Sequence, residues 1–289
     1  MRRLTWLPLA VLLAAVSGCG YESAHAEGKL DVVATTTQVA DLARQVGGAR
    51  VHVVGLLAPN ADPHEYELRP HDMAAVADAD VVLRSGGDVD AWLDEAIDGS
   101  GTKARVITLS DGIEPRGDDP HWWQDPRNAE IAAREIGAAL HVDPAPYVRR
   151  LERLDRAVAR CIGRVPPSRR KLVTTHDALG YYAARYGIDV IGTVIPSLST
   201  AGQPSAGDTA RLVQTIRDTG VQAIFAESSV NPKVEQAIAR ETGARVGRAL
   251  WADTLGPPGS DGATYIQSIE SNTQAIVDGF TGGAVRCTF

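Results

Sequence analysis

The segment that decides the fold is Ala145-Pro-Tyr-Val-Arg-Arg-Leu-Glu-Arg-Leu-Asp-Arg-Ala-Val-Ala-Arg-Cys-Ile162, near the middle of a chain of 289 residues. Its apolar side chains recur every three or four residues and arginines fill the opposite face, which is the pattern of an amphipathic helix. Pro144 and Pro146 stand at its start, and Pro166 and Pro167 follow its end, so both ends are marked. At 1.5 Å per residue the helix spans roughly 25–30 Å, enough to carry the chain between two domains.

On both sides of this segment, short strand patterns alternate with helix patterns. Strands are expected in the first half at Leu30–Ala34, Arg50–Leu57, Asp80–Arg84 and Arg105–Leu109. The alternation restarts in the second half, with strands expected at Lys171–Thr175, Asp189–Ile195, Val221–Ala226 and Arg245–Leu250. The helix patterns begin after Thr36 or Thr37 and recur at Asp72–Ala77, Val89–Ile97, Asn128–Leu140 and Gly262–Phe280. Repeated βα units form parallel sheets covered by helices, so we predict an α/β fold.

The predicted organisation is an N-terminal α/β lobe over residues 30–143, a connecting helix over residues 144–165 and a C-terminal α/β lobe over residues 166–289. The chain is long enough for two domains of ordinary size. The alternative that the pattern allows is a single domain in which the central segment is one more surface helix.

The N-terminus resembles the signal of a bacterial lipoprotein. After a basic start, residues 4–16 are apolar apart from one threonine and too few to span a bilayer. Small residues before Cys19 resemble the site where such a signal is cut and the cysteine receives a diacylglycerol. We therefore expect a signal peptide at residues 1–18, lipidation of Cys19 and a polar tether at residues 19–29. The protein would then work at the outer face of the cytoplasmic membrane. The alternative is an ordinary secretory signal cut nearby.

Cysteine usage agrees with export. The chain has three cysteines, and lipidation of Cys19 leaves Cys161 and Cys287, an even pair in an oxidising compartment, which suggests one disulfide. The alternative is two buried free thiols. Metal ligation by these two residues is disfavoured, because neither has a second cysteine or a histidine nearby in the sequence.

Charge and hydropathy limit the partners. The formal net charge is -7 and basic residues form no long run, which argues against nucleic acid as a partner. Beyond the N-terminal leader, no apolar stretch is long enough to be a transmembrane helix. Contact with the membrane is therefore expected through the lipid anchor.

Three histidines stand in loops that follow predicted strands: His64 in Ala-Asp-Pro-His-Glu, His121 between two Asp-Pro turns, and His176 in Val-Thr-Thr-His-Asp. In parallel α/β sheets, binding sites form beyond the carboxyl ends of the strands. Asp253 obeys the same rule. Each of these residues alone is more often a hydrogen-bonding or capping residue, but three imidazoles with one carboxylate suit zinc. Two come from each half, so we predict one metal site in the cleft between the lobes.

The segments that carry these residues resemble the metal-binding receptors of bacterial ABC importers for zinc and manganese. They are Pro59–Glu67, Asp119–Pro126, Thr175–Tyr182 and Leu250–Asp253. The resemblance covers essentially the whole exported chain. It implies two α/β lobes joined by one rigid helix, and delivery of the metal to a membrane permease with a cytoplasmic ATPase. We expect a monomer.

The third ligand bears on the choice of metal. The manganese and iron receptors that the chain resembles typically have a carboxylate where this chain has His176. Three nitrogens and one carboxylate favour Zn²⁺ as the transported ion, one per chain, while manganese prefers oxygen-rich sites. Many zinc receptors also carry a long His-rich loop, whereas residues 112–118 contain no histidine. Trp122-Trp123 and Ile195–Thr200 look like a subgroup that lacks this loop, so a separate zinc-delivering chaperone is a possible partner.

Other receptors, adhesins and hydrolases are the classes that compete with a zinc receptor. A receptor for manganese or another divalent metal and a metal-dependent surface adhesin are the alternatives, and a zinc hydrolase is disfavoured. The chain lacks His-Glu-x-x-His, and four protein ligands leave no position for a catalytic water, so we expect no enzyme. The histidines expected not to bind the transported metal are His25, His52, His71 and His141. The carboxylates that are candidates to hold a ligand histidine by its second ring nitrogen are Glu65, Asp177 and Glu227.

Overall fold

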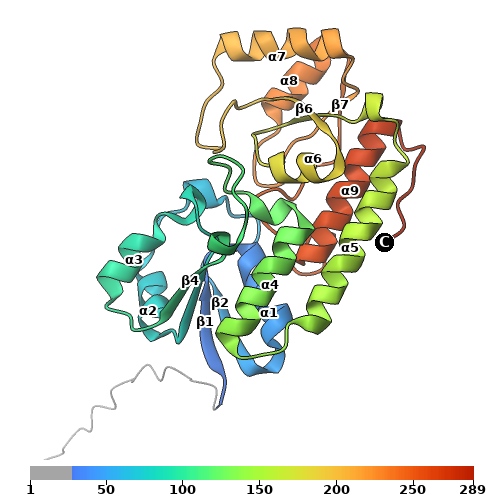
Figure 1. The fold of residues 1–289 in the computed structure, drawn as a ribbon. Coiled ribbons are helices and arrows are strands. Elements are labelled where there is room, and N and C mark those ends of the chain that lie inside the picture. The colour runs from blue at the N-terminus through green and yellow to red at the C-terminus, as the bar shows by residue number, and fades with distance from the viewer. Residues whose placement is uncertain (1–27) are drawn as a thin grey trace, which may run out of the picture.

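The computed structural model of the chain describes residues 28–289 (Figure 1). The predicted signal peptide, Cys19 and most of the predicted tether lie outside these residues. Within the part of the chain that is described, no helix is both long and apolar enough to cross a membrane.

The N-terminal half contains a parallel sheet of four strands in the order β2-β1-β3-β4. Its strands are β1 (Leu30–Ala34), β2 (Val51–Gly55), β3 (Val81–Arg84) and β4 (Arg105–Thr108). The predicted strands are thus confirmed in position, with ends that differ by a few residues. Because β2 and β3 lie on opposite sides of β1, the strand order reverses at this point, and such a reversal creates a crevice at the carboxyl ends of the strands.

Helices cover both faces of this sheet. One face packs against α1 (Thr37–Gly47) and α4 (Pro126–Leu140), and the other against α2 (Pro70–Asp78) and α3 (Leu93–Ser100). The side chains of β1 alternate between the two layers, as the period of a strand requires. Val32 and Ala34 join the first layer, and Val33 joins the second.

The predicted connecting segment is a single helix, α5 (Ala145–Gly163). It runs beside α9 (Tyr265–Thr281), and both lie along one side of the molecule (Figure 1). The end of α5 is tied to the C-terminal tail by a disulfide between Cys161 and Cys287, whose Cα atoms are 5.3 Å apart. One hydrophobic core includes buried residues of α1, α4, α5 and α9, so the two halves share packing along these helices. The exact division into lobes remains a prediction.

The C-terminal half has two short parallel strand pairs, β5 (Lys171–Thr174) with β6 (Asp189–Thr193) and β7 (Ala223–Ile224) with β8 (Arg245–Val246). Its helices are α6 (Gly180–Tyr186), α7 (Ala206–Thr219) and α8 (Lys233–Thr242). The predicted extents of β7 and β8 were wrong. Pairing breaks off after Val246, where the ring of Phe225 packs against Gly247 so closely that a Cβ atom there would lie 2.6 Å from the ring. It resumes only as an isolated bridge between Glu227 and Leu250.

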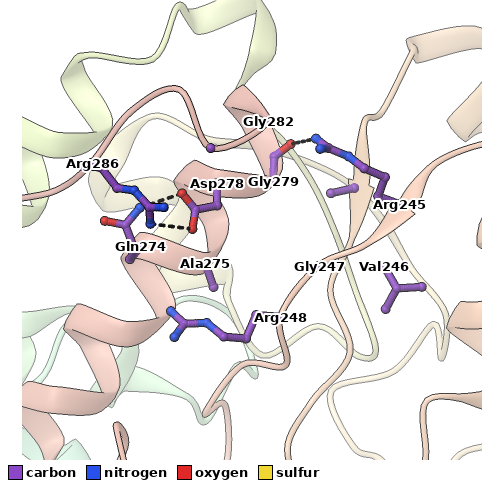
Figure 2. A pocket seen from close by; sticks show the side chains of 12 residues that line it. Arg245, Val246, Gly247, Arg248, Gln274, Ala275, Asp278, Gly279, Gly282 and Arg286 are labelled. Atoms are coloured by element: carbon purple, nitrogen blue, oxygen red, sulfur yellow. Dashed lines mark hydrogen bonds and ion pairs between the residues drawn. The ribbon is translucent and has the colours of Figure 1, made fainter.

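A hollow of about 460 Å³ lies between β8, α9 and the C-terminal tail. Figure 2 shows that two arginines at its wall, Arg245 and Arg286, already have partners. Arg286 faces Asp278 at 3.7 Å, Arg245 donates to the carbonyl of Gly279 at 3.3 Å, and Arg248 pairs with an aspartate further along the chain at 2.8 Å. This hollow therefore offers an anion few free donors.

Candidate metal centre

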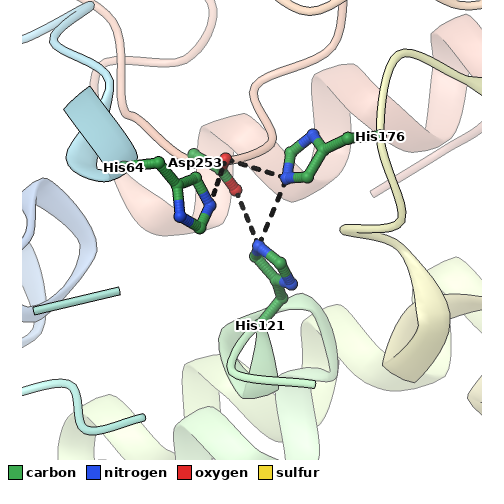
Figure 3. A group of neighbouring side chains, drawn as sticks. All are labelled: His64, His121, His176 and Asp253. Carbon is green, nitrogen blue, oxygen red and sulfur yellow. Dashed lines mark hydrogen bonds and ion pairs between the residues drawn. The ribbon is translucent and has the colours of Figure 1, made fainter. Parts of the chain in front are cut away.

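The four residues predicted to bind metal come together in one buried cluster (Figure 3). Each offers one ligand atom, and these atoms lie within 4.8 Å of one another. The side chains of His121, His176 and Asp253 are fully buried, and that of His64 is 3% exposed. Figure 3 shows the three rings and the carboxylate pointing toward one another from separate segments of the chain.

Local geometry explains how the cluster forms. His64 lies in a short 3₁₀ turn after β2, His121 follows β4 by way of the Asp-Pro turn, and His176 comes two residues after β5. Asp253 lies in the loop beyond β8. All four thus follow the carboxyl ends of parallel strands, as the sequence predicted.

The distances within the cluster fit one small cation. Three imidazole nitrogens approach the Asp253 carboxylate: Nε2 of His64 at 3.3 Å, Nε2 of His121 at 3.4 Å and Nε2 of His176 at 3.1 Å. The two nitrogens of His121 and His176 are 3.3 Å apart. Four ligand atoms at the corners of a tetrahedron around zinc, with bonds of about 2.0–2.1 Å, lie about 3.3–3.4 Å from each other.

Unpaired polar atoms also point to a cation. Despite the short distances, neither carboxylate oxygen of Asp253 has a hydrogen-bond partner, and Nε2 of His64 has none. Buried polar groups in native proteins are almost always paired. A cation bound between these atoms would satisfy them together, so the residues present fit a metal ion.

An Asp-Pro-His sequence occurs twice in the site. Asp62 accepts a hydrogen bond from the backbone N–H of His64 at 3.0 Å, and Asp119 accepts the equivalent bond from His121 at 3.0 Å. The aspartate closes a local turn that the following proline stiffens. Asp119 also lies 2.8 Å from Nδ1 of His121. This role of Asp119 was not among the predictions from the sequence, although the repeated Asp-Pro-His motif was a signal for it.

Glu227 holds His176 in the same manner. Its Oε1 lies 2.7 Å from Nδ1 of His176 and accepts the backbone N–H of the same residue at 3.1 Å. A carboxylate at Nδ1 keeps the proton there and leaves Nε2 free to face the centre. Of the three predicted carboxylates, Glu227 therefore has the expected contact. No such contact involves Glu65 or Asp177 among the described residues.

The loop of Asp253 is fastened to the other half of the chain. The carbonyl of Ala252, next to the ligand, accepts hydrogen bonds from Trp123 Nε1 at 3.0 Å and Gln124 Nε2 at 2.7 Å. Gln38 Nε2 approaches the same oxygen at 3.4 Å. The Trp-Trp-Gln sequence after His121, in the N-terminal half, therefore positions the carboxylate ligand that comes from the C-terminal half.

The charged groups of the cluster shift one another's pKa values. Burial opposes a charge on His176, but the carboxylates of Asp253 and Glu227 outweigh it and raise the pKa of His176 to about 11. Burial likewise opposes the Asp253 carboxylate, yet the nearby His176 and His121 hold the pKa of Asp253 well below its usual range. Burial raises the pKa of Glu227. Without metal, a proton on His176 therefore takes the place of the cation.

The remaining histidines lie elsewhere. His52 pairs with Asp31 at 2.9 Å and His71 with Asp72 at 2.9 Å. His141 follows the end of α4 in a left-handed conformation, and His25 lies outside the described residues. Among the described residues, these histidines are not part of the cluster.

Comparison with known proteins assigns the family. A family model described as "Zinc-uptake complex component A periplasmic" matches residues 32–279. The chain belongs to this family. Its members are extracytoplasmic receptors that bind a divalent metal for an ABC importer, and they are not enzymes. The hydrolase alternative is therefore excluded, and the predicted fold and extracytoplasmic location are confirmed.

Individual relatives differ in their metal. The manganese-binding lipoprotein MntA of Bacillus subtilis (strain 168) is 32% identical, over 93% of this chain and 97% of its own. The zinc-binding protein TroA of Treponema pallidum (strain Nichols) is 30% identical, over 94% of this chain and 95% of its own. The solved structure of TroA gives a TM-score of 0.78 at 27% identity, and covers 88% of this chain and 99% of that one. The family thus assigns a divalent metal, and its members include proteins named for manganese and for zinc.

Proposed function

We propose that this protein captures Zn²⁺ outside the cytoplasm and delivers it to the permease and cytoplasmic ATPase of an ABC importer. His64, His121, His176 and Asp253 bind one ion per chain. The observation that supports zinc is the position of His176, whose Nε2 faces the cluster. It completes a set of three nitrogens and one carboxylate, which suits zinc better than manganese.

The protein groups also account for how the ion is held. Four ligands replace its hydration shell, and the carboxylates of Asp119 and Glu227 keep two of the rings in the tautomer that presents Nε2. Zinc must displace the proton from His176, so capture releases a proton to the solvent. Because protein ligands fill the site, no coordination position is left for catalytic chemistry.

Manganese is the second candidate, because MntA, a manganese-binding lipoprotein, is 32% identical to this chain. Elemental analysis of protein purified without added metal, followed by competition titrations with Zn²⁺ and Mn²⁺, separates the two. We expect one zinc per chain and much tighter binding of zinc than of manganese. Equal affinities, or manganese as the metal retained, would overturn the zinc assignment.

Substitution of the third ligand tests its role directly. His176→Ala should weaken zinc binding strongly, and His176→Glu should shift the preference toward manganese by adding an oxygen donor. His52→Ala is the matched control, because His52 is exposed and pairs with Asp31 outside the site. A His176→Ala variant whose zinc affinity stays within about twofold of the control would lose far less than a direct ligand should contribute.

We further propose that residues 1–18 are a signal peptide and that Cys19 carries a lipid anchor. The name of MntA as a lipoprotein supports this, as does the run of small residues before Cys19. In fractionated cells, Cys19→Ala should move the protein from the membrane to the soluble fraction. Unchanged membrane retention would contradict the anchor. A monomeric state and a zinc-delivering chaperone remain predictions.

A further inference from the structure

A hollow of about 450 Å³ is lined by residues of both halves of the chain, among them sequence neighbours of two metal ligands. From the N-terminal half it is lined by Asp62 and Glu65, which flank one ligand histidine, and from the C-terminal half by Thr175, which precedes another. Glu235, in the first turn of α8, completes this set. An ion in this hollow would therefore lie against the segments that carry two of the four metal ligands.

The hollow carries negative charge. Asp62, Glu65 and Glu235 line it, and Lys233 is the one cationic residue among the side chains that do so. Much of the remaining wall is apolar, including Ile195. A concave, low-dielectric surface with charge of one sign concentrates counter-ions and accelerates their capture.

One of these carboxylates lacks a partner. Glu235 is 2% exposed, and its Oε1 accepts a hydrogen bond from Thr175 Oγ1 at 2.7 Å. Its Oε2 has no hydrogen-bond partner, and neither does the buried hydroxyl of Ser229, which lines the same hollow. Unpaired buried oxygens are costly. A water molecule of a hydrated cation could donate to Oε2 and supply the missing partner.

The spacing of the carboxylates indicates whether they could bind a bare ion or a hydrated one. Among the described residues, the buried cluster is the one place where three or more metal-binding side chains converge within ligand distance. Asp62, Glu65 and Glu235 are thus too far apart to bind a bare ion together. They suit a cation that keeps its water shell, held by charge and through water-mediated hydrogen bonds.

We propose that this hollow is a loading site, where a hydrated divalent cation is held before it loses its water to the histidines. The inference rests on the proposed function in one respect, namely that the neighbouring cluster is the ion's destination. It concerns the rate of association, which should change alike for both metals, whereas the zinc assignment concerns the ligands and the preference for zinc over manganese, so the two can fail separately.

The test is stopped-flow measurement of the association rate constants of Zn²⁺ and Mn²⁺ with the full exported protein. The variants are Glu65→Gln, Glu235→Gln and the pair together. Glu67→Gln is the matched control, because Glu67 is an exposed carboxylate two residues from Glu65 that does not line the hollow. The pair should slow association about tenfold at low ionic strength, for both metals alike. Dissociation should stay unchanged, and salt should shrink the difference.

Magnesium provides a second readout, since it binds oxygen and keeps several of its waters. Mg²⁺ should slow zinc association to the wild type beyond the effect of sodium chloride at equal ionic strength, and should lose this effect in the paired variant. If Glu235→Gln fails to fold, Glu65→Lys at the exposed wall still has to slow association. Association rates equal to those of Glu67→Gln, or the same magnesium effect in wild type and variant, would overturn the loading site.

Discussion

His121 and His176 each face a buried carboxylate through Nδ1, at 2.8 Å and 2.7 Å, whereas His64 is fixed through its backbone by Asp62. Two of the three rings are therefore oriented by a charge that also makes their free nitrogens better ligands. The affinity of the site should depend on Asp119 and Glu227 although neither is expected to touch the metal.

Glu227→Ala should lower zinc affinity about 10–100-fold, which is the usual effect of removing the partner of a ligand histidine. Glu227→Gln, which keeps an acceptor but loses the charge, should fall between this variant and the wild type. Asp177→Asn is the control, because it lies next to His176 without contacting its ring. Competition titration measures all three. If Glu227→Ala bound zinc as tightly as Asp177→Asn, the carboxylate would have no role in holding the ring.

Zinc affinity should rise with pH. The metal-free protein holds a proton on His176, because Asp253 and Glu227 outweigh the effect of burial and raise the pKa of His176 to about 11. Zinc must displace this proton at every pH below that value. Competition with this one proton should therefore make the apparent zinc affinity rise about tenfold for each unit of increasing pH.

A zinc competition titration from about pH 5 to about pH 8, the range that brackets free histidine, measures this dependence. In weakly buffered solution near neutral pH, an indicator dye should also report release of about one proton per zinc bound. Affinity that does not change with pH would mean that imidazoles are not the ligands.

At the residue scale, the three histidines could be predicted because each follows a strand whose pattern is plain in the sequence, and Asp253 because it stands just past the predicted strand at Arg245–Leu250. The contacts that support them could not. Asp119 is close in sequence to His121, so the Asp-Pro-His repeat offered a signal. The hydrogen bonds from Trp123 and Gln124 to the Ala252 carbonyl join residues 129 and 128 positions apart, and only the tertiary structure brings them together.

At the scale of elements, the helix pattern at Ala145–Ile162 matches α5 to within one residue, because prolines flank a long amphipathic stripe, and the predicted connecting region of residues 144–165 ends two residues beyond it. The strands of the first half were equally well marked. β7 and β8 were not. The apolar run of β7 continues through Phe225 and Ala226, which are buried without regular pairing, whereas Arg248 and Ala249 beyond β8 are exposed. Hydropathy reports burial and not strand pairing, so it could not place the ends of these two strands.

The disulfide fastens the end of α5 to the tail that follows α9, across 126 positions of sequence. Replacing both cysteines by serine should lower the free energy of unfolding by up to about 4–5 kcal/mol, the value for a closed loop of this size. Urea unfolding of metal-free protein measures the change, and non-reduced wild type should resist alkylation at both positions. Two alkylatable thiols, or unchanged stability, would contradict a structural role for the bridge.

At the scale of the whole molecule, the two halves are tied together at the site as well as along α5. The backbone N–H of Leu255 donates to Thr37 Oγ1 at 2.8 Å, and that of Tyr265 donates to Asp41 at 2.8 Å. Asp253 therefore comes from the C-terminal half but is anchored to the N-terminal half. The sequence predicted that both halves supply ligands, but it could not show this crossing, because the bonds join segments more than 200 residues apart.

X-ray absorption spectroscopy at the zinc edge, on exported protein purified without added metal, identifies the atoms bound to the ion. We expect one zinc per chain, with three imidazole nitrogens and one carboxylate oxygen at about 2.0–2.2 Å and no sulfur. The same spectrum should be lost in His176→Ala. An oxygen-dominated shell, a sulfur ligand, or an unchanged spectrum in His176→Ala would contradict the claim that His64, His121, His176 and Asp253 bind the zinc.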